Sequence, residues 1–337
     1  MEKQLRVPYE ELYETLFKVL RKIGFEENRA ALCARLFAET TRDGVYSHGL
    51  NRFPRFLRTI ENGSVDVNAA PHKINAFGAL ERWDGRRGAG NTNAYFAMER
   101  AILLAQTNGI GCVALGNTNH WMRGGSYGWQ AAEAGFIGIC WTNTLANLPP
   151  WGANEPRIGN NPLVIAVPRK SGAHVVLDMA ISQFSYGALE SHRKRGEFLP
   201  VDGGYDLSGN LTRDPAEIEK SGRVLPIGFW KGSGLALALD MLAAMLSGGL
   251  ATHQIAQNPE RETNISQTFI AINLSALDEN QFAAHLAEQI VKDLKSANEN
   301  VRYPGEKTLQ IRRENTEKGI PVDRKIWSEI GSILKQT

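Results

Sequence analysis

The chain has 337 residues, of which 42% are hydrophobic and 22% are charged, and this balance excludes a disordered, collagen-like or coiled-coil protein. Its length suits two or three domains, or one large domain. The sequence contains 38 Lys and Arg residues and 36 Asp and Glu residues, so its formal net charge is only +2. This small positive charge does not favour nucleic acid as a partner.

The chain contains three cysteines: Cys33, Cys112 and Cys140. They are too few and too scattered for a disulfide framework or a metal site, so we expect buried thiols in a reducing compartment. The N-terminus, Met1-Glu2-Lys3-Gln4-Leu5-Arg6, runs into charged residues rather than an apolar stretch, which is not typical of a signal peptide. The longest apolar run, Leu235 to Leu246, is interrupted by Asp240 and is too short to span a bilayer. We therefore expect a cytoplasmic protein that does not contact a membrane.

Two helices are expected at the N-terminus. Residues Pro8 to Phe25 repeat apolar side chains at helical spacing, and Pro8 and Gly24 suit the two ends of a helix. Residues Glu26 to Thr41 form a second such pattern. The polar segment Val45 to Gly49 follows it directly, and a polar loop that contains a histidine is a natural place for a functional site.

From Gly109 onward, short apolar runs are typical of strands. The expected strands are Ile110–Leu115, Phe136–Trp141, Leu163–Val167, Val175–Leu177 and Thr268–Ile272. Further helices are expected over Ser126–Glu133, from Leu235, over Gln281–Leu294 and over Asp323–Leu334. This mixture predicts an α/β or α+β fold with a mainly buried sheet. Residues Glu190 to Pro226 are polar and indicate a long surface excursion or a lid.

The usual nucleotide and metal motifs are absent from the sequence. Gly88-Ala89-Gly90 and Gly232-Ser233-Gly234 begin like a dinucleotide-binding fingerprint, but each lacks the third glycine and a strong leading strand. A Walker A pattern and zinc-binding motifs are missing as well, so we expect no metal. A nicotinamide cofactor would have to bind without the Rossmann fingerprint.

The first candidate site is Ser47-His48-Gly49-Leu50-Asn51-Arg52. A histidine readily exchanges a proton near neutral pH, and an arginine one helical turn later can hold a carboxylate. The pair would suit a 2-oxo acid, with Arg52 on the carboxylate and His48 protonating the forming alkoxide. The alternative is a helix-capping Ser-His with a surface arginine, and the spacing alone favours this alternative.

Four further segments are candidates, each with a structural alternative. Asn117-Thr118-Asn119-His120 with Arg123-Gly124-Gly125-Ser126 follows a strand and precedes a helix, as anion sites do, or is a plain loop. Asp178 can hold a ribose hydroxyl, orient a histidine or cap a helix. Trp230-Lys231 and the glycines that follow can bind a phosphate or allow tight helix packing. Pro304-Gly305-Glu306-Lys307 by itself indicates only a turn.

Taken together, these segments resemble the type-2 malate/L-lactate dehydrogenase family along essentially the whole chain. The motifs that carry the resemblance are Ser47-His48-Gly49 with Arg52, Asn119-His120-Trp121, Asn160-Asn161-Pro162, Leu177-Asp178-Met179, Lys231-Gly232-Ser233-Gly234 and Pro304-Gly305-Glu306. Within the family, the chain is most similar to members that reduce 2,3-diketo-L-gulonate. The longer runs that indicate this are Gly44 to Gly49, Asn51 to Phe56, His120 to Gln130 and Leu199 to Gly204.

The resemblance implies an α/β fold that binds NAD(H) without a Rossmann domain, with a mixed sheet and flanking helices, in a homodimer whose site lies between domains. It implies His48 as proton donor, with His120 as the rival for that role. Ser47, Arg52 and Arg123 are expected to bind the substrate. The expected cofactor contacts are Ala173, His174, Val175, Val176, Leu177, Asp178, Met179, Ala180, Trp230, Lys231, Gly305, Glu306 and Lys307.

Two departures from the family pattern lie on the cofactor side: Gln183 stands where methionine is expected, and Glu306-Lys307 where His-Glu is expected. They bear on the choice between NADH and NADPH. The expected regions are a helical N-terminal substrate and dimer region over 1–75, a central α/β cofactor-binding region over 76–300 with its excursion near 190–226, and a C-terminal segment over 301–337 that packs back on the first.

The expected activity is the NADH-dependent reduction of 2,3-diketo-L-gulonate to 3-keto-L-gulonate, a small 2-keto sugar acid being the partner. The alternative within the family is a dehydrogenase of malate, L-lactate or a ureidoglycolate-type 2-hydroxy acid. An alternative of another class is a non-catalytic protein that binds a sugar acid or a nucleotide.

Overall fold

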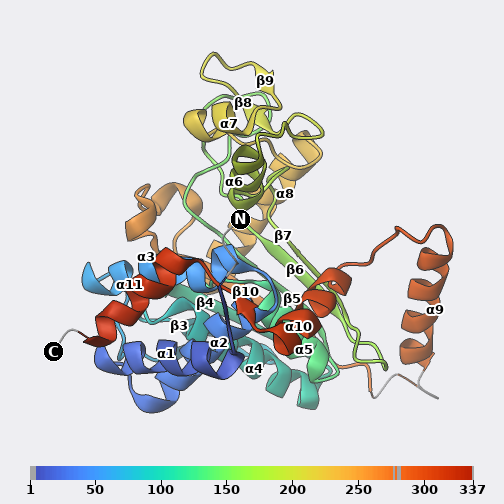
Figure 1. Cartoon of the computed structure of the whole chain (residues 1–337). Helices are drawn as coiled ribbons and strands as arrows, with labels where there is room; N and C mark the ends of the chain where they lie inside the picture. Colours follow the sequence, from blue (N-terminus) through green and yellow to red (C-terminus); the bar gives the residue numbers. More distant parts are fainter. Residues whose placement is uncertain (1–4, 276–277, 279–281, 336–337) are drawn as a thin grey trace.

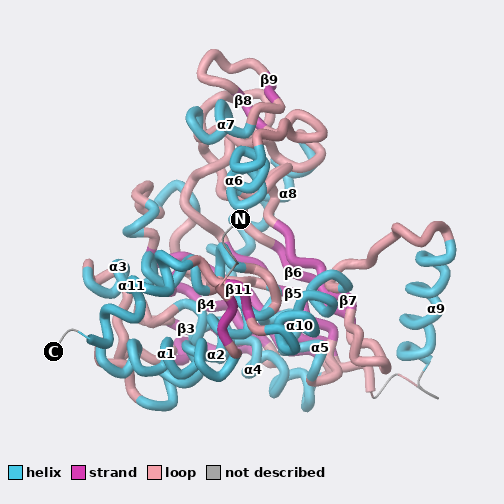
Figure 2. The backbone as a smooth tube through the Cα atoms, in the orientation of Figure 1, coloured by secondary structure: helices cyan, strands magenta, loops and turns pink. Residues whose placement is uncertain are grey.

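The computed structural model describes residues 5–275, 278 and 282–335. A seven-stranded sheet lies at its centre in the order β2-β3-β4-β10-β5-β6-β7 (Figures 1 and 2). Its strands are β2 (His72–Phe77), β3 (Leu80–Asp84), β4 (Ile110–Asn119), β5 (Ile137–Thr142), β6 (Leu163–Val167), β7 (Val175–Met179) and β10 (Thr263–Ile272). The β3–β4 pair is parallel and the other pairs of this sheet are antiparallel, which confirms the predicted mixed sheet.

Helices cover both faces of the sheet. They are α4 (Gly90–Asn108) and α5 (Gly125–Glu133) on one face and α8 (Trp230–Ser247) on the other. Successive side chains of a strand point to opposite faces. Accordingly, Cys140 and Phe269 pack with α4 and α5, whereas Ile139 and Ile270 pack toward α8. The expected flanking helices are confirmed, although the sequence did not predict α4, β2 or β3. The expectation of a mainly buried sheet is wrong at β2, an edge strand whose six residues are all exposed.

The two ends of the chain share one core. The helices α1 (Tyr9–Lys22), α2 (Glu27–Arg42), α3 (Phe53–Glu61) and α11 (Arg324–Lys335) surround it, and the short strands β1 (Arg6–Val7) and β11 (Ile320–Pro321) pair beside it. Leu12, Leu16 and Phe37 from the N-terminal helices are buried there with Ile320 and Ile330. The helical periodicity of residues 8–41 is thereby explained, because its apolar faces form this core.

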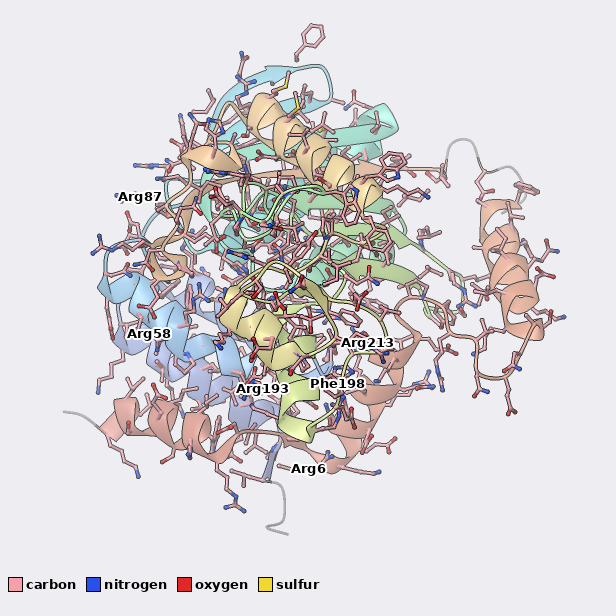
Figure 3. All side chains as sticks on the ribbon, turned by 90° about the horizontal axis from the view of Figure 1, so that it is seen from above. Arg6, Arg58, Arg87, Arg193, Phe198 and Arg213 are labelled. Atoms are coloured by element: carbon pink, nitrogen blue, oxygen red, sulfur yellow. The ribbon has the colours of Figure 1, made fainter. Side chains whose placement is uncertain are left out.

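A small unit rises above the sheet between β7 and α8 (Figure 1). Its elements are α6 (Tyr186–Arg195), β8 (Gly204–Tyr205), β9 (Leu211–Thr212) and α7 (Pro215–Ser221). Leu189, Leu199 and Ile218 are fully buried in a core that this unit shares with α8. Seen from above, the unit carries Arg193, Phe198 and Arg213 over the middle of the molecule (Figure 3).

The remaining elements are α9 (Phe282–Ser296), α10 (Glu306–Lys318) and the short helices η1 (Tyr46–His48), η2 (Leu50–Arg52), η3 (Thr252–Gln254) and η4 (Pro259–Arg261). Helix α9 stands apart from the body in both views (Figures 1 and 3). Its predicted first residue, Gln281, lies outside the described residues.

Several predicted boundaries are wrong. Strand β10 begins at Thr263 instead of Thr268, and β7 ends at Met179 instead of Leu177. The strand that was expected to end at Leu115 continues to Asn119, because Thr118 and Asn119 pair with β10 and are buried there instead of forming a polar loop. Helix α8 begins at Trp230 rather than at Leu235, so the glycine-rich segment forms its first turns.

Candidate active site

The first candidate segment forms two short helices that fold back on α2. His48 ends η1 and Arg52 ends η2. The Leu50 N–H donates to Thr41 Oγ1 at 2.9 Å, and a Cβ atom at Gly49 would lie 2.4 Å from the same oxygen. Only glycine therefore permits this close approach, which directs His48 and Arg52 toward the end of β4.

His48 and His120 meet there although they are 72 positions apart in the sequence. Their ring centroids lie 5.9 Å apart with an angle of 18° between the ring planes. The hydroxyl of Ser47 lies 3.0 Å from Nδ1 of His48, and the Met122 N–H donates to Nδ1 of His120 at 3.1 Å. These contacts leave Nε2 of each ring available for a substrate.

The hydrogen bonds distinguish the two histidines. Because a backbone N–H always donates, Nδ1 of His120 must act as an acceptor, and the proton of the neutral ring must lie on Nε2. A hydroxyl can donate or accept, so Ser47 is compatible with both the neutral and the protonated ring of His48. Protonation of His120 would break a hydrogen bond, whereas protonation of His48 would not.

Both histidines are held neutral in the free protein. Burial, assisted by the charges of Arg52 and Arg123, lowers the pKa of His48 to about 4. Burial, together with Arg52 and His48, holds the pKa of His120 well below its usual value. A bound anion beside Arg52 would offset these positive charges and raise the pKa of each histidine.

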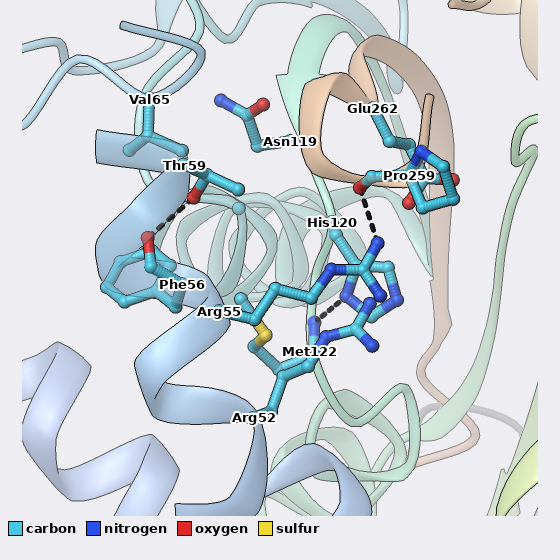
Figure 4. A pocket seen from close by; sticks show the side chains of 11 residues that line it. Arg52, Arg55, Phe56, Thr59, Val65, Asn119, His120, Met122, Pro259 and Glu262 are labelled. Carbon is cyan, nitrogen blue, oxygen red and sulfur yellow. Dashed lines mark hydrogen bonds between the residues drawn. The ribbon is translucent and has the colours of Figure 1, made fainter. Parts of the chain in front are cut away.

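A pocket lies next to the histidine pair (Figure 4). Helix α3 with Arg52, the end of β4 with His120, and the loop that contains Pro259 and Glu262 form its walls. The space between them is about 360 Å³, part of it open to solvent. The residues that line it are Arg52, Arg55, Phe56, Thr59, Val65, Gly90, Asn119, His120, Met122, Pro259 and Glu262.

Arg52 is the unpaired cation of this pocket. Burial and the neighbouring charge of Arg55 lower its pKa to about 10, so it is still protonated at pH 7. Among the described residues, no side chain or carbonyl accepts a hydrogen bond from its guanidinium, whereas Arg55 donates to the Pro259 carbonyl. A half-buried, unpaired guanidinium is costly and is suited to bind a carboxylate.

Arg123, which was expected to bind substrate, lies in a buried ion-pair network beside the pocket. Its Nη1 donates to Asp43 Oδ2 at 2.7 Å. Arg312 donates to both oxygens of Asp43, at 2.8 and 2.7 Å, and Arg42 contacts Oδ1 at 3.1 Å. The network joins α2, the segment before α5, and α10. Arg123 is therefore already paired, and Arg52 is the better carboxylate ligand.

The structure brings the three predicted cofactor segments together along β7. Ala173 and His174 precede this strand, and residues 175–179 form it, with Ala180 directly after. At one end, the Val176 N–H donates to the Pro304 carbonyl at 2.9 Å, next to Gly305, Glu306 and Lys307 at the start of α10. At the other end, the Ile227 N–H donates to the Ile181 carbonyl at 2.8 Å, just before Trp230 and Lys231.

Two features of this strip suit a ribose and phosphate chain. Gly305 has a φ of +96° and lies so close to β7 that a Cβ atom would be 3.2 Å from the His174 carbonyl oxygen. Oε2 of Glu306 is buried, and no described residue donates to it, so it can accept a hydroxyl of a ligand. Trp230 and Lys231 are both exposed at the far end.

Two of the predicted anion-binding features are occupied by the protein itself. The Gly125 N–H at the start of α5 donates to Asp178 Oδ2 at 2.8 Å, so this helix start binds the chain's own carboxylate. Gly232 fits against the backbone of Ile227, where a Cβ atom would lie 2.1 Å from the carbonyl oxygen. The glycine after Lys231 therefore serves close packing.

The sequence analysis missed Arg55, Glu262 and Asp43. Arg55 lies three residues after Arg52, so it shares a side of the helix that begins there, and this spacing was an available signal. Glu262 and Asp43 gave no signal, because Leu145, which donates to Glu262, lies 117 positions away and Arg123, the buried partner of Asp43, lies 80 positions away.

Within residues 5–275, 278 and 282–335, the structure contains no group of three or more His, Cys, Asp or Glu residues that could hold a metal ion. Across the same described part of the chain, no helix combines the length and the apolar character that a membrane span requires.

The chain is similar to known dehydrogenases and reductases along almost its whole length. Residues 7–331 match the malate/L-lactate dehydrogenase family. The chain is 48% identical over 334 residues to a 2,3-diketo-L-gulonate reductase of Citrobacter koseri, and the match covers 98% of this chain and 100% of the relative. The 2,3-diketo-L-gulonate reductase of Escherichia coli K12 matches with the same identity and coverage. These matches confirm the resemblance predicted from the motifs.

Solved structures show the same fold. The sulfolactate dehydrogenase from Methanocaldococcus jannaschii superposes with a TM-score of 0.91 at 28% identity, covering 98% of this chain and 97% of that one. A putative malate/lactate dehydrogenase from E. coli superposes with a TM-score of 0.90 at 30% identity, covering 98% and 95%.

Proposed function

Because the chain belongs to the malate/L-lactate dehydrogenase family, we propose that it reduces 2,3-diketo-L-gulonate to 3-keto-L-gulonate with NADH as the reductant. The family supports the reaction type, and the names of the full-length relatives at 48% identity support the substrate. The observation that carries the proposal is the unpaired guanidinium of Arg52 in a pocket lined by His120, whose neutral ring stacks on that of His48 beside the pocket.

The 2-keto acid end of the substrate binds at Arg52. A guanidinium can donate two parallel hydrogen bonds to a carboxylate, which fixes both its position and its orientation. Since no described residue occupies this guanidinium, binding requires no internal ion pair to break. Burial is the main cause of the lowered pKa of His48 and His120, and the bound carboxylate offsets the second cause, the positive charge of Arg52.

Once the substrate carboxylate is bound, His48 takes up a proton from solvent and donates it from Nε2 to the forming alkoxide, while His120 donates a hydrogen bond from Nε2 of its neutral ring. The Met122 N–H fixes the proton of neutral His120 on Nε2 and opposes a second proton on Nδ1. His48 has no such restriction, since Ser47 Oγ can accept from a protonated Nδ1. After donation, His48 is neutral, which is the form that its buried surroundings favour.

The cofactor is held along β7 by Ala173 to Ala180, by Trp230 and Lys231, and by Gly305 to Lys307. When bound, NADH supplies the hydride that reduces the keto carbon. Oε1 of Glu306 forms an ion pair with Lys295, but its buried Oε2 has no donor among the described residues. Glu306 therefore supports NADH over NADPH, because a ribose hydroxyl of NADH can donate to Oε2, whereas the 2′-phosphate of NADPH offers it acceptor oxygens. Asp178 holds the start of α5 against this strip through Gly125.

The protein acts as a homodimer. Helix α9 stands away from its own chain and exposes apolar side chains four residues apart (Figure 1). These side chains are Phe282, Leu286, Ile290 and Leu294. An apolar stripe of this kind is typical of an interface. Light scattering should give twice the mass of one chain, and Ile290→Lys should shift the equilibrium toward the monomer, whereas a wild-type monomer would refute this proposal.

The proposed reaction is tested by NADH absorbance with the purified protein and 2,3-diketo-L-gulonate, oxaloacetate or pyruvate, and then with NADPH. We expect the highest kcat/KM with the diketo acid and NADH. A higher kcat/KM with oxaloacetate or pyruvate would instead assign a malate- or lactate-type dehydrogenase. Cofactor binding without turnover of any of them would point to a non-catalytic binding protein.

A further inference from the structure

One buried carboxylate in the pocket has no role in the mechanism above. Glu262 follows η4 and is 8% exposed, on the wall that lies across the pocket from α3 (Figure 4). Its Oε1 accepts from the Leu145 N–H at 3.1 Å. Among the described residues, no other donor reaches its side chain and no cation lies within 4.0 Å of it, so Oε2 has no partner there.

The loop that presents Glu262 is fixed to α3. Arg55 donates to the Pro259 carbonyl, Arg58 contacts the Glu260 carboxylate at 3.2 Å, and the Asn62 side chain donates to the Glu260 carbonyl at 2.8 Å. These three contacts hold the walls of the pocket at a defined separation. Glu262 therefore faces the same space as Arg52 from a rigid position rather than from a mobile loop.

Electrostatics keep Glu262 available as an acceptor. Burial raises the pKa of Glu262, but the Leu145 N–H and the charges of Arg52 and Arg55 favour the charged form. Oε2 of Glu262 is not fully enclosed by the protein, and its residue lines the pocket, so a ligand hydroxyl in the pocket can donate to it. A ligand methyl group would leave it unsatisfied, and a ligand carboxylate would repel it.

We propose that Glu262 selects the substrate class by accepting a hydrogen bond from a hydroxyl group on the tail of the 2-keto acid bound at Arg52. This inference rests on the proposed function and adds a reason for its substrate. Arg52 recognises the carboxylate that all family substrates named here share, whereas Glu262 favours a polyhydroxylated tail over the methyl group of pyruvate or the second carboxylate of oxaloacetate.

The test is Glu262→Gln, with kcat/KM measured for 2,3-diketo-L-gulonate and oxaloacetate at one pH. Glutamine keeps an acceptor for the Leu145 N–H but removes the charge. We expect the ratio of kcat/KM for the diketo acid to that for oxaloacetate to fall by about 10- to 100-fold, because a hydrogen bond to a charged group is lost and a repulsion is removed. The ratio does not depend on the fraction of folded enzyme.

Glu155→Gln is the matched control, because it makes the same change at an exposed carboxylate outside the pocket lining, and it should leave the ratio within about twofold. An unchanged ratio in Glu262→Gln, with a wild-type enzyme active on the diketo acid, would refute the role of Glu262 alone. A wild-type enzyme that prefers oxaloacetate would refute the proposed function, and with it this inference.

Discussion

Asp43 is the carboxylate whose replacement should lower the free energy of unfolding most clearly. Its side chain is 2% exposed, and that of its partner Arg123 is 5% exposed, with 2.7 Å between Oδ2 and Nη1. Arg312 and Arg42 also contact Asp43, but both keep access to water. In Asp43→Asn, Arg123 is left as a buried cation without a counter-charge. Removing one partner of a buried ion pair costs about 3–5 kcal/mol.

We therefore expect Asp43→Asn to lower the free energy of unfolding by about 3–5 kcal/mol. Urea unfolding followed by tryptophan fluorescence measures the change. Glu155→Gln is the control, because its ion pair with Arg157 has 72% of each side chain exposed and should contribute less than about 1 kcal/mol. Combining Asp43→Asn with Arg123→Met should recover part of the loss. A loss below about 1 kcal/mol in Asp43→Asn would refute this reasoning.

Three further predictions concern the pocket, the adjacent histidine and the cofactor strip. Arg52→Gln should raise KM for the diketo acid about 10- to 100-fold in steady-state assays, with no loss of unfolding free energy, because an unpaired buried cation is removed; an unchanged KM would assign the carboxylate elsewhere. The pKa of His48 is about 4 in the folded chain and about 6.5 when unfolded, so its contribution to stability is full above pH 6.5 and falls by about 3 kcal/mol toward pH 4. Urea titrations should show a flatter pH dependence in His48→Gln, and equal slopes would refute the buried, neutral state. Glu306→Gln should improve kcat/KM with NADPH relative to NADH at least threefold, and an unchanged ratio would remove Glu306 from cofactor choice.

Local sequence patterns predicted those helices and strands whose apolar residues recur on one face of the element. The helices over residues 8–41 were predictable because their apolar residues recur with helical spacing and fill one core. Helix α4 was missed because it has small residues where a clear apolar stripe would be expected. Ala94, Ala97 and Ala101 let the helix backbone lie close to the sheet, although their side chains are small. The end of β4 was missed because its ladder partner in β10 lies about 145 positions later.

The candidate site was predictable only as separate segments. His48, Arg52 and His120 have residue types that suit proton transfer and carboxylate binding, but the sequence does not show that two rings 72 positions apart stack on each other. Arg123 was expected to bind substrate because its partner Asp43 lies 80 positions earlier and could not be paired with it from the sequence. Glu262 becomes a candidate only when its loop closes the pocket.

We propose His48 as the proton donor to a 2-keto acid bound in the adjacent pocket. The most direct test compares kcat for 2,3-diketo-L-gulonate in His48→Gln and His120→Gln, with the exposed His253→Gln as control. A positioned acid contributes about 10²–10⁴-fold, so we predict at least a 100-fold loss for His48→Gln, a smaller loss for His120→Gln, and wild-type kcat for the control. A larger loss in His120→Gln than in His48→Gln, or a loss below tenfold in both, would contradict the account.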